Sequence, residues 1–307
     1  MRKVVVVGCG NVGITYVSNI IATKGIVNEI VLIDIDRDKI LGDVMDFNHA
    51  AVVYNNNISI KAGTYKDCFN ADIVVIAAGY NQEVGQSRLD LISKNKIILE
   101  DITKKIMQSG FDGIIIVATN PVDIMCYVVK NASNLSANRV IGTGTMLDTD
   151  RIKFLLSQKI KVSTENIHAY VLGEHGDSSF AVWSKSSIGM VPIKETVSDE
   201  DLDIIETESK NLAYKIIKYK GYTNYGIAMC LHKLTKAILN DENVVLNVSS
   251  YIDWIYISMP SVIGRDGVKG IMKINFNEEE EAKYNISKEV IREAINSMEV
   301  EEDVDRY

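Results

Sequence analysis

The feature of the sequence that most constrains the fold is a glycine-rich turn between a short apolar run and a helical pattern. Four consecutive valines precede the segment 8–13, Gly-Cys-Gly-Asn-Val-Gly, and apolar residues at helical spacing follow it. A continuous apolar run of this kind is typical of a parallel strand that helices bury on both faces. The segment therefore predicts a strand that turns directly into a helix, which is the first unit of an α/β sheet.

The same alternation of apolar runs and helical patterns continues through the first half of the chain. Short buried strands are predicted at Lys3–Val7, Glu29–Ile33, Ile58–Lys61, Ile73–Ala77, Gly113–Ala118 and Val140–Gly142. Helical periodicity separates them at Val12–Thr23, Asp36–His49, Arg88–Ser109 and Pro121–Ser133. Strands that alternate with helices in this way form a doubly wound parallel sheet, so residues 1–144 are predicted to be a Rossmann domain.

The pattern changes near residue 145, where a second domain of the α+β class is predicted to begin and to extend to residue 307. A helix is expected over Met146–Lys159, and a longer helical stretch from Asp199. Asn277 is expected to cap a final helix, because four glutamates follow it at the positive end of the helix dipole. Between them, turn-separated runs predict antiparallel strands at Val244–Ser249, Trp254–Met259 and Gly270–Phe276.

Composition and charge exclude several classes of protein. With 307 residues, 47% of them hydrophobic, the chain is long enough for about two domains. Its 33 basic and 41 acidic residues give a net charge of -8, which disfavours nucleic acid as a partner. No apolar run approaches a membrane span, and the amino terminus lacks the apolar stretch of a signal sequence. The four cysteines show neither metal-ligand spacing nor a disulfide framework, so a cytoplasmic protein without a metal is predicted.

The glycine-rich turn is also a candidate dinucleotide site. Gly8 permits the tight turn, Gly10 lets a pyrophosphate approach the backbone, and Gly13 lets the helix pack closely on the strand. Asp34 ends the second strand, and a carboxylate there accepts hydrogen bonds from ribose hydroxyls and repels a 2'-phosphate. Together these features favour NAD over NADP, whereas the turn alone also fits FAD or a turn without a ligand.

A second candidate site surrounds one of only four histidines in the chain. The segment 172–177, Leu-Gly-Glu-His-Gly-Asp, follows a strand-like run over Ile167–Leu172. Imidazole titrates near neutral pH, so a positioned histidine can give and take a proton within one turnover. A proton-transfer site is therefore predicted at His175, and the alternative is an ordinary hydrogen-bonded histidine in a loop.

Five motifs in order connect these sites to a known family. The turn at 8–13 is followed by Asn-Gln-Glu-Val-Gly-Gln-Ser-Arg-Leu at 81–89, Thr-Asn-Pro-Val-Asp at 119–123, Leu-Asp-Thr-Asp-Arg at 147–151 and the His175 segment. In order and spacing the chain closely resembles the L-lactate/malate dehydrogenase family over nearly its whole length, and most of all the bacterial L-lactate dehydrogenases. The resemblance implies hydride transfer between NAD and a small 2-hydroxy or 2-oxo acid.

The resemblance assigns roles to the charged residues. His175 matches the acid/base that protonates the substrate oxygen, and Asp148 matches the carboxylate that orients the imidazole and favours its charged form. Arg151 shares a helix face with Asp148 and matches the arginine that pairs with the substrate carboxylate. Arg88 matches the arginine that polarises the substrate carbonyl when a glycine-containing loop closes. The alternatives are a helix-capping acid for Asp148 and a surface ion pair for Arg151.

The resemblance also assigns neutral residues. Gln82 stands where malate enzymes carry an arginine, and an amide there would leave the second charge of a dicarboxylate unpaired, so pyruvate and lactate are favoured. Asn120 matches a residue that hydrogen-bonds substrate and cofactor, with a turn before a helix as its alternative. Thr223 matches a residue of the pocket wall. The predicted cofactor contacts are Gly8, Gly10, Asn11, Val12, Gly13, Asp34, Gly79 and Asn120.

Other functions stay open at this stage. An L-2-hydroxyisocaproate-type dehydrogenase is one alternative, because the segments 142–145, 222–227 and 263–267 resemble those enzymes and the segment 191–201 is short. Against it, the loop 81–88 has the length found in lactate enzymes. A malate dehydrogenase fits less well. A silent NAD-binding protein on the same fold is the alternative outside enzymes, and it has no need of a proton donor.

Three residues bear on regulation and local charge. His168 stands where bacterial lactate enzymes activated by fructose 1,6-bisphosphate carry a histidine, but Lys153 replaces the arginine of that anion site. A lysine keeps the charge and loses the planar fork, so this effector is an open alternative. Asp150 replaces an alanine expected within the 147–151 motif. Bacterial relatives imply a homotetramer, with a dimer as the alternative.

Overall fold

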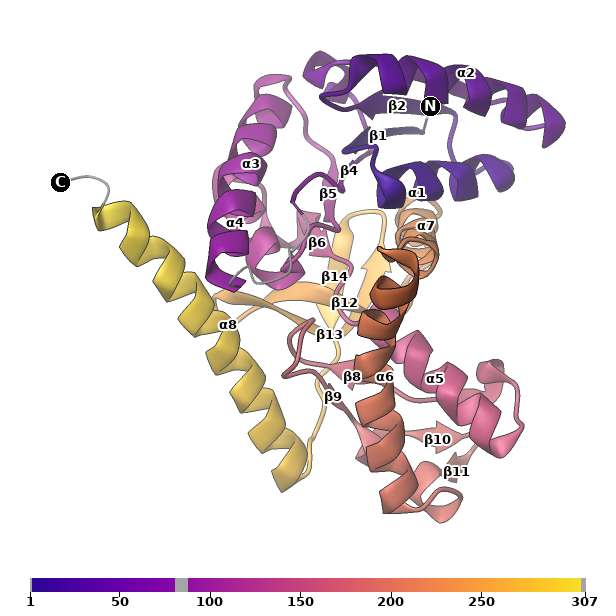
Figure 1. Cartoon of the computed structure of the whole chain (residues 1–307), viewed down its shortest axis with the longest axis vertical. Helices are drawn as coiled ribbons and strands as arrows, with labels where there is room; N and C mark the ends of the chain where they lie inside the picture. The colour runs from indigo at the N-terminus through magenta and orange to yellow at the C-terminus, as the bar shows by residue number, and fades with distance from the viewer. Residues whose placement is uncertain (1, 81–87, 305–307) are drawn as a thin grey trace.

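The structure is a computed structural model that describes residues 2–80 and 88–304, and its centre is a parallel sheet (Figure 1). The parallel strands are adjacent in the order β3-β2-β1-β4-β5-β6. This order reverses between β1 and β4, and dinucleotides bind at such a switch point. The predicted Rossmann-type sheet is confirmed, with strands β1 Lys3–Val7, β2 Glu29–Ile33, β3 Ser59–Ala62, β4 Ile73–Ile76, β5 Ile114–Val117 and β6 Val140–Gly142.

Helices cover both faces of the sheet, as buried parallel strands require. Side chains alternate along β1, so Val4 and Val6 belong to one core, and Val5 and Val7 to the other. The first core is covered by α1 Asn11–Ala22, α2 Arg37–Val53 and α7 Tyr225–Leu239, and the second by α3 Arg88–Gln108 and α4 Val122–Ser133.

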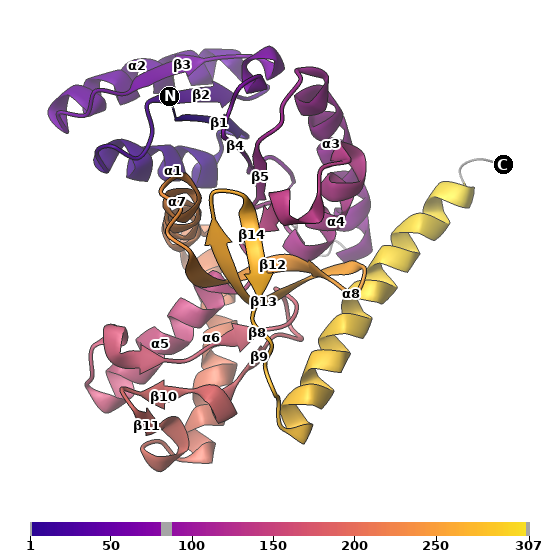
Figure 2. The same ribbon diagram turned by 180° about the vertical axis from the view of Figure 1, so that it is seen from behind.

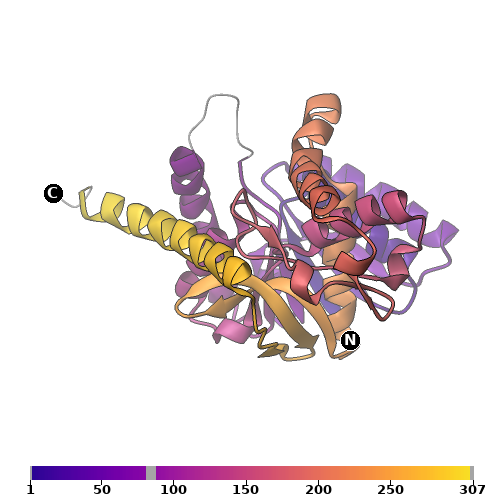
Figure 3. The same ribbon diagram turned by 90° about the horizontal axis from the view of Figure 1, so that it is seen from below.

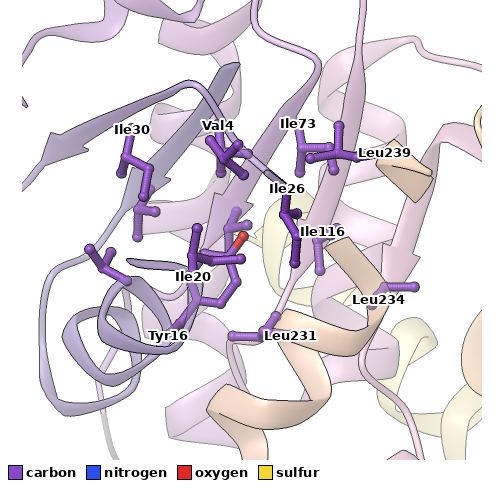
Figure 4. Close-up of a cluster of buried hydrophobic side chains, with 14 of the residues drawn as sticks. Val4, Tyr16, Ile20, Ile26, Ile30, Ile73, Ile116, Leu231, Leu234 and Leu239 are labelled. Carbon is purple, nitrogen blue, oxygen red and sulfur yellow. The ribbon is translucent and has the colours of Figure 1, made fainter. Parts of the chain in front are cut away.

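Helix α7 belongs to the second half of the chain but packs on the first half. Figure 4 shows Leu231 of α7 beside Tyr16 and Ile20 of α1, and Leu234 of α7 belongs to the same buried cluster. The Tyr16 hydroxyl lies 2.8 Å from Thr235 Oγ1, so the one polar group of this fully buried tyrosine has a partner. The two halves of the chain therefore share one hydrophobic core.

The antiparallel strands extend the same sheet beyond β6, giving the order β14-β13-β12-β6 (Figure 2). A single residue pair, Ser249 with Gly142, joins β12 to β6. Asp253 and Trp254 have positive φ and form the tight turn of the first hairpin, which is why the second strand begins later than predicted. The strands are β12 Val244–Ile252, β13 Ile255–Gly264 and β14 Gly267–Ile271.

Two further strand predictions differ from the structure by more than their end residues. The third antiparallel strand is β14, and the predicted run Gly270–Phe276 is wrong over most of its length, because the turn at Gly267, with φ of +91°, starts the strand earlier. The run Ile167–Leu172 forms two strands rather than one, since each half pairs with a different partner. These pairs are β7 Ile167–His168 with β10 Ser187–Ile188, and β8 Val171–Leu172 with β9 Phe180–Ala181. A short β11, Val191–Pro192, pairs with β10.

Three further helices complete the second half: α5 Met146–Ile160, α6 Asp199–Lys220 and α8 Glu278–Val304. Figure 3 shows α8 along one side of the molecule, where Ile291 and Ile295 pack on β13. Asn277 caps α8 as predicted: the Glu280 N–H donates to Asn277 Oδ1 at 2.8 Å, and the Asn277 N–H donates back to Glu280 at 3.3 Å.

The described part of the chain contains neither a membrane-spanning helix nor a metal site. No helix there is both long and apolar enough to cross a membrane. No group of histidine, cysteine and acidic side chains there has the arrangement of a metal site. The four cysteines are buried and none forms a disulfide.

The β6–β12 junction predicts that Gly142→Ala destabilises the fold. A Cβ at Gly142 would lie 2.6 Å from Cys126 Sγ and 2.7 Å from Ser249 Cβ, so we expect a loss of about 1–3 kcal/mol. Gly42→Ala is the control, because nothing lies within 4 Å of its Cβ position in α2 and it should stabilise by up to about 1 kcal/mol. Urea unfolding of both variants checks this, and equal stability of the two would contradict the packing argument.

Candidate active site

His175 lies in the loop that follows β8, and contacts from distant elements hold this loop. Gly173 and Ser258 of β13 exchange two main-chain hydrogen bonds, at 3.1 and 3.0 Å. The Glu174 N–H donates to Ser287 Oγ of α8 at 3.1 Å. The backbone on the amino-terminal side of the histidine is therefore tied to the antiparallel strands and to the last helix.

The glycines on either side of His175 are required by close packing. Gly173 has a φ of +92°, and a Cβ there would lie 2.5 Å from Ser287 Oγ. A Cβ on Gly176 would lie 2.7 Å from Glu174 Oε1. The spacing of the Leu-Gly-Glu-His-Gly-Asp segment thus has a steric cause as well as a chemical one.

His175, Asp148 and Arg151 are hydrogen-bonded in sequence. The His175 Nδ1 lies 2.7 Å from Asp148 Oδ2, and Arg151 Nη1 donates to Asp148 Oδ1 at 2.8 Å. Asp148 and Arg151 stand three residues apart in α5, so they share one helix face. Their side chains are 17% and 12% exposed and that of His175 is 25% exposed, so the imidazole stays accessible beside a shielded ion pair.

Arg151 is predicted to pair with a substrate carboxylate, and in the structure it pairs with Asp148. Among residues 2–80 and 88–304 this is its only hydrogen bond, and it uses one guanidinium nitrogen. A guanidinium carries five N–H donors, so the remaining donors can still bind a carboxylate. Asp150, the unexpected acid between Asp148 and Arg151, is exposed on the outer side of α5.

The electrostatics of the site favour a protonated imidazole. Burial lowers the pKa of His175, but the charge and hydrogen bond of Asp148, with the charge of Asp123, raise it by more than burial and Arg151 lower it. Burial raises the pKa of Asp148, but His175 and Arg151 outweigh it and hold that pKa below its usual range. The net result is an ionised carboxylate beside a histidine that binds a proton more tightly than usual.

A second carboxylate contacts the main chain of His175. Asp123, in the first turn of α4, is 2% exposed, and its Oδ2 accepts the His175 main-chain N–H at 2.7 Å. Its Oδ1 accepts the hydroxyl of Ser249, which is fully buried on β12. The sequence-based prediction assigned no role to Asp123. The sequence feature that could have indicated a role for Asp123 is its position in the 119–123 motif, just after a parallel strand.

The predicted cofactor residues lie at the carboxyl end of β1. A Cβ on Gly8 would lie 2.4 Å from Ala78 N, and a Cβ on Gly13 would lie 2.1 Å from Gly8 O. Gly10 differs, because nothing lies within 4 Å of its Cβ position, and no side chain caps α1, which begins at Asn11. The open backbone and the free helix end fit an anionic pyrophosphate.

Asp34 lies beside the glycine turn. Its Oδ2 accepts the Cys9 N–H at 2.6 Å, and its Oδ1 accepts the Asp36 N–H at 3.1 Å. Next to Asp34, the side chain of Ile35 is fully exposed, and a cavity opens on the other side between Asp34 and Tyr65. This carboxylate beside apolar surface fits the ribose and base of an adenine nucleotide.

The loops after β4 and β5 are joined by a residue that the sequence-based prediction did not include. Asn95 of α3 is fully buried, and its side chain accepts the Tyr80 N–H at 2.7 Å and donates to Asn120 O at 2.8 Å. Gly79 is needed here, since a Cβ would lie 2.5 Å from Thr119 Cγ2. Asn120 is exposed at this edge of the sheet, and its predicted contact with substrate stays a prediction.

Comparison with known proteins shows the family to which the chain belongs. The model of the lactate/malate dehydrogenase NAD-binding domain matches residues 2–142, and that of the α/β C-terminal domain matches residues 145–302. The chain belongs to the lactate/malate dehydrogenase family. The family resemblance predicted from the sequence motifs is confirmed.

Individual members of the lactate/malate dehydrogenase family are similar over nearly the whole chain. An L-lactate dehydrogenase of Geobacillus sp. (strain WCH70) is 44% identical, over 96% of this chain and 96% of its own. One of Borrelia turicatae is 43% identical, over 97% and 98%. The crystal structure of MGS-M5, a lactate dehydrogenase from a deep-sea metagenome library, has a TM-score of 0.94 at 44% identity and covers 97% of this chain and 100% of its own.

For several residues expected from the lactate/malate dehydrogenase family, the structure either does not describe the side chain or shows no contact with His175 or Arg151. Gln82 lies outside the described residues, and of Arg88 the structure describes only its place at the start of α3. Thr223 is half-buried in the turn between α6 and α7, with no hydrogen bond to His175 or Arg151. Val12 is half-buried at the start of α1. The roles of all these residues stay predictions.

The open space at Gly10 predicts a cofactor-binding variant. Gly10→Ala should leave stability unchanged and weaken NADH binding by about tenfold or more, because the new methyl group would occupy the pyrophosphate position. Gly13→Ala is the contrasting variant, with its methyl group against Gly8 O and an expected loss of stability. NADH fluorescence titration with thermal unfolding measures both. Unchanged NADH affinity in Gly10→Ala would contradict the assignment.

Proposed function

We propose that the chain is an NAD-dependent L-lactate dehydrogenase that interconverts pyruvate and L-lactate. The observation that carries the proposal is the His175–Asp148 hydrogen bond of 2.7 Å, with Arg151 on the same face of α5. A proton donor next to a carboxylate clamp is what reduction of a small 2-oxo acid needs. The relatives named L-lactate dehydrogenase, at 42–44% identity, support the same choice.

In this proposal one nitrogen of His175 carries the transferred proton. Its Nδ1 is engaged with Asp148, so Nε2 is the atom that donates to the substrate oxygen during reduction and accepts from the hydroxyl during oxidation. The charge of Asp148 stabilises the imidazolium before transfer. Arg151 holds the substrate carboxylate with guanidinium donors that Asp148 does not use, which fixes the carbonyl next to His175.

The cofactor in this proposal is NAD. NADH, when bound, supplies the hydride. Gly10 and the free end of α1 would hold its pyrophosphate, and Asp34 would accept hydrogen bonds from the adenosine ribose. A 2'-phosphate would meet the Asp34 carboxylate, so NADPH should be a poor substitute.

The remaining sequence-based expectations are part of the proposal. These are a cytoplasmic location, a homotetramer or dimer, and a domain division at residues 144 and 145. Fructose 1,6-bisphosphate stays an alternative effector near Lys153 and His168. Here burial lowers the pKa of Lys153, His168 is exposed, and Lys153 Nζ lies 5.9 Å from the centre of the Tyr170 ring.

A substrate panel tests the proposed function directly. Initial rates with NADH should be highest for pyruvate, lower for 2-oxoisocaproate and lowest for oxaloacetate, and NADPH should lower every rate. A clear preference for 2-oxoisocaproate would instead establish the branched-acid alternative. If NADH binds and no 2-oxo acid is reduced, the chain is a silent NAD-binding protein. Repeating the panel with fructose 1,6-bisphosphate tests the effector.

Gln82→Arg tests the residue expected to select the substrate. An added guanidinium would pair with the second carboxylate of oxaloacetate, so the ratio of kcat/KM for oxaloacetate to that for pyruvate should rise by about tenfold or more. Gln86→Arg, in the same segment, is the control for an added positive charge. An unchanged ratio in Gln82→Arg would count against the assigned role.

A further inference from the structure

His175 is contacted by two carboxylates, and only one of them reaches its side chain. Asp148 bonds to Nδ1 of the ring, whereas Asp123 bonds to the main-chain N–H of the same residue at 2.7 Å. Asp123 comes from α4, in the first half of the chain, and His175 from the loop after β8. The contact therefore joins the dinucleotide-binding half to the proton donor.

The burial of Asp123 is costly unless its carboxylate is satisfied. The residue is 2% exposed, and a buried carboxylate without partners is strongly disfavoured. Here Oδ2 accepts the His175 N–H and Oδ1 accepts the Ser249 hydroxyl. Any displacement of the His175 backbone would weaken one of these charge-assisted bonds, so the buried charge resists movement of the loop.

We propose that Asp123 is a positioning residue for proton transfer, which fixes the backbone of His175 and places a second negative charge near the imidazole. The inference rests on the proposed function only in naming His175 as the proton donor. It separates two effects of one carboxylate: the bond to the N–H sets where the ring lies, and the charge sets how tightly the ring holds its proton.

The charge effect has a definite sign. Burial and Arg151 lower the pKa of His175, while Asp148 and Asp123 raise it, so among the described residues the charged groups of α4 and α5 that act on the ring are Asp123, Asp148 and Arg151. On α4 itself, Cys126 is the other titratable neighbour of Asp123, and burial keeps that thiol neutral by raising its pKa. Reduction needs the imidazolium, so activity is lost as pH rises through the pKa of His175.

Asp123→Asn isolates the charge. The amide oxygen can still accept the His175 N–H, and the amide nitrogen can donate to Ser249 Oγ, so the shape is kept and the charge is lost. We expect the alkaline limb of the kcat/KM profile for pyruvate to move to lower pH, with kcat at low pH within about threefold of the parent. Asp123→Ala removes both bonds and should lower kcat at every pH by about 100-fold.

Glu280→Gln is a matched control elsewhere in the fold. Glu280 is 4% exposed and, like Asp123, accepts a main-chain N–H and a hydroxyl from distant residues, here both from Ser184 at 2.9 and 2.6 Å; it also accepts the Asn277 N–H at 3.3 Å. It has no hydrogen bond to His175 within the described residues. The same loss of buried charge there should leave the pH profile unchanged. If Glu280→Gln shifts the profile as far as Asp123→Asn does, the proposal is wrong.

A titration that needs no turnover separates this proposal from the proposed function. The chain has four histidines, and His175→Gln identifies the imidazole Cε1–H resonance of His175 in the NMR spectrum. The pH midpoint of the titration of that resonance should be lower in Asp123→Asn than in the parent, and it should be unchanged in Glu280→Gln. If the titration curves of His175 in the parent and in Asp123→Asn coincide, the proposal is wrong even when the enzyme is active. An inactive parent with a shifted midpoint would instead reject the proposed function alone.

Ser249→Ala keeps the test decisive if Asp123→Asn does not fold. This variant removes one hydrogen bond to Asp123 and leaves its charge and its bond to the His175 N–H. We expect kcat/KM to fall about fivefold without a shift of the alkaline limb to lower pH, because the carboxylate is less firmly held but still charged. Parent-like kcat/KM in Ser249→Ala would contradict the positioning role.

Discussion

The junction of β6 with β12 is the constraint on which the rest of the site depends. One residue pair, Gly142 with Ser249, joins the parallel strands to the antiparallel strands. Since Gly142 has no side chain, Cys126 and Ser249 pack directly against its backbone. This close approach sets β12 against α4, and it brings Ser249 within hydrogen-bonding distance of Asp123.

Two sets of contacts connect that junction to His175. Ser258 of β13, the strand beside β12, holds Gly173 by two main-chain bonds, and Asp123 of α4 holds the His175 N–H. Asp148, at the start of α5 directly after β6, then meets the imidazole. Each of these contacts uses a backbone group or a short side chain, so the distances are set by the sheet rather than by flexible side chains.

The glycines at the carboxyl end of β1 have two different roles. Gly8 and Gly13 are required because neighbouring backbone lies where a Cβ would be, and Gly10 is free of neighbours. Only the second case has room for a ligand. The same distinction separates Gly173 and Gly176, which shape the His175 loop, from positions that face open space. A glycine in a motif therefore has to be interpreted through its surroundings.

The sequence alone determined the parallel strands and the family. Continuous valine and isoleucine runs are buried whatever they pack against, so β1, β2 and β6 were predicted at their observed bounds. Asp148 and Arg151 were predicted to share a face because helical spacing is local. Where a partner strand decides the outcome, as at Ile167–Leu172, sequence reasoning predicted one strand and the structure has two.

Only the tertiary structure decided how the site is held together. The bonds of Asp123, Asn95 and Ser287 join residues that lie 15 to 126 positions from their partners, and no periodicity in the sequence reports such pairs. Local patterns specify elements and residue types, whereas the positions of charges around His175 follow from the sheet order that brings those elements together.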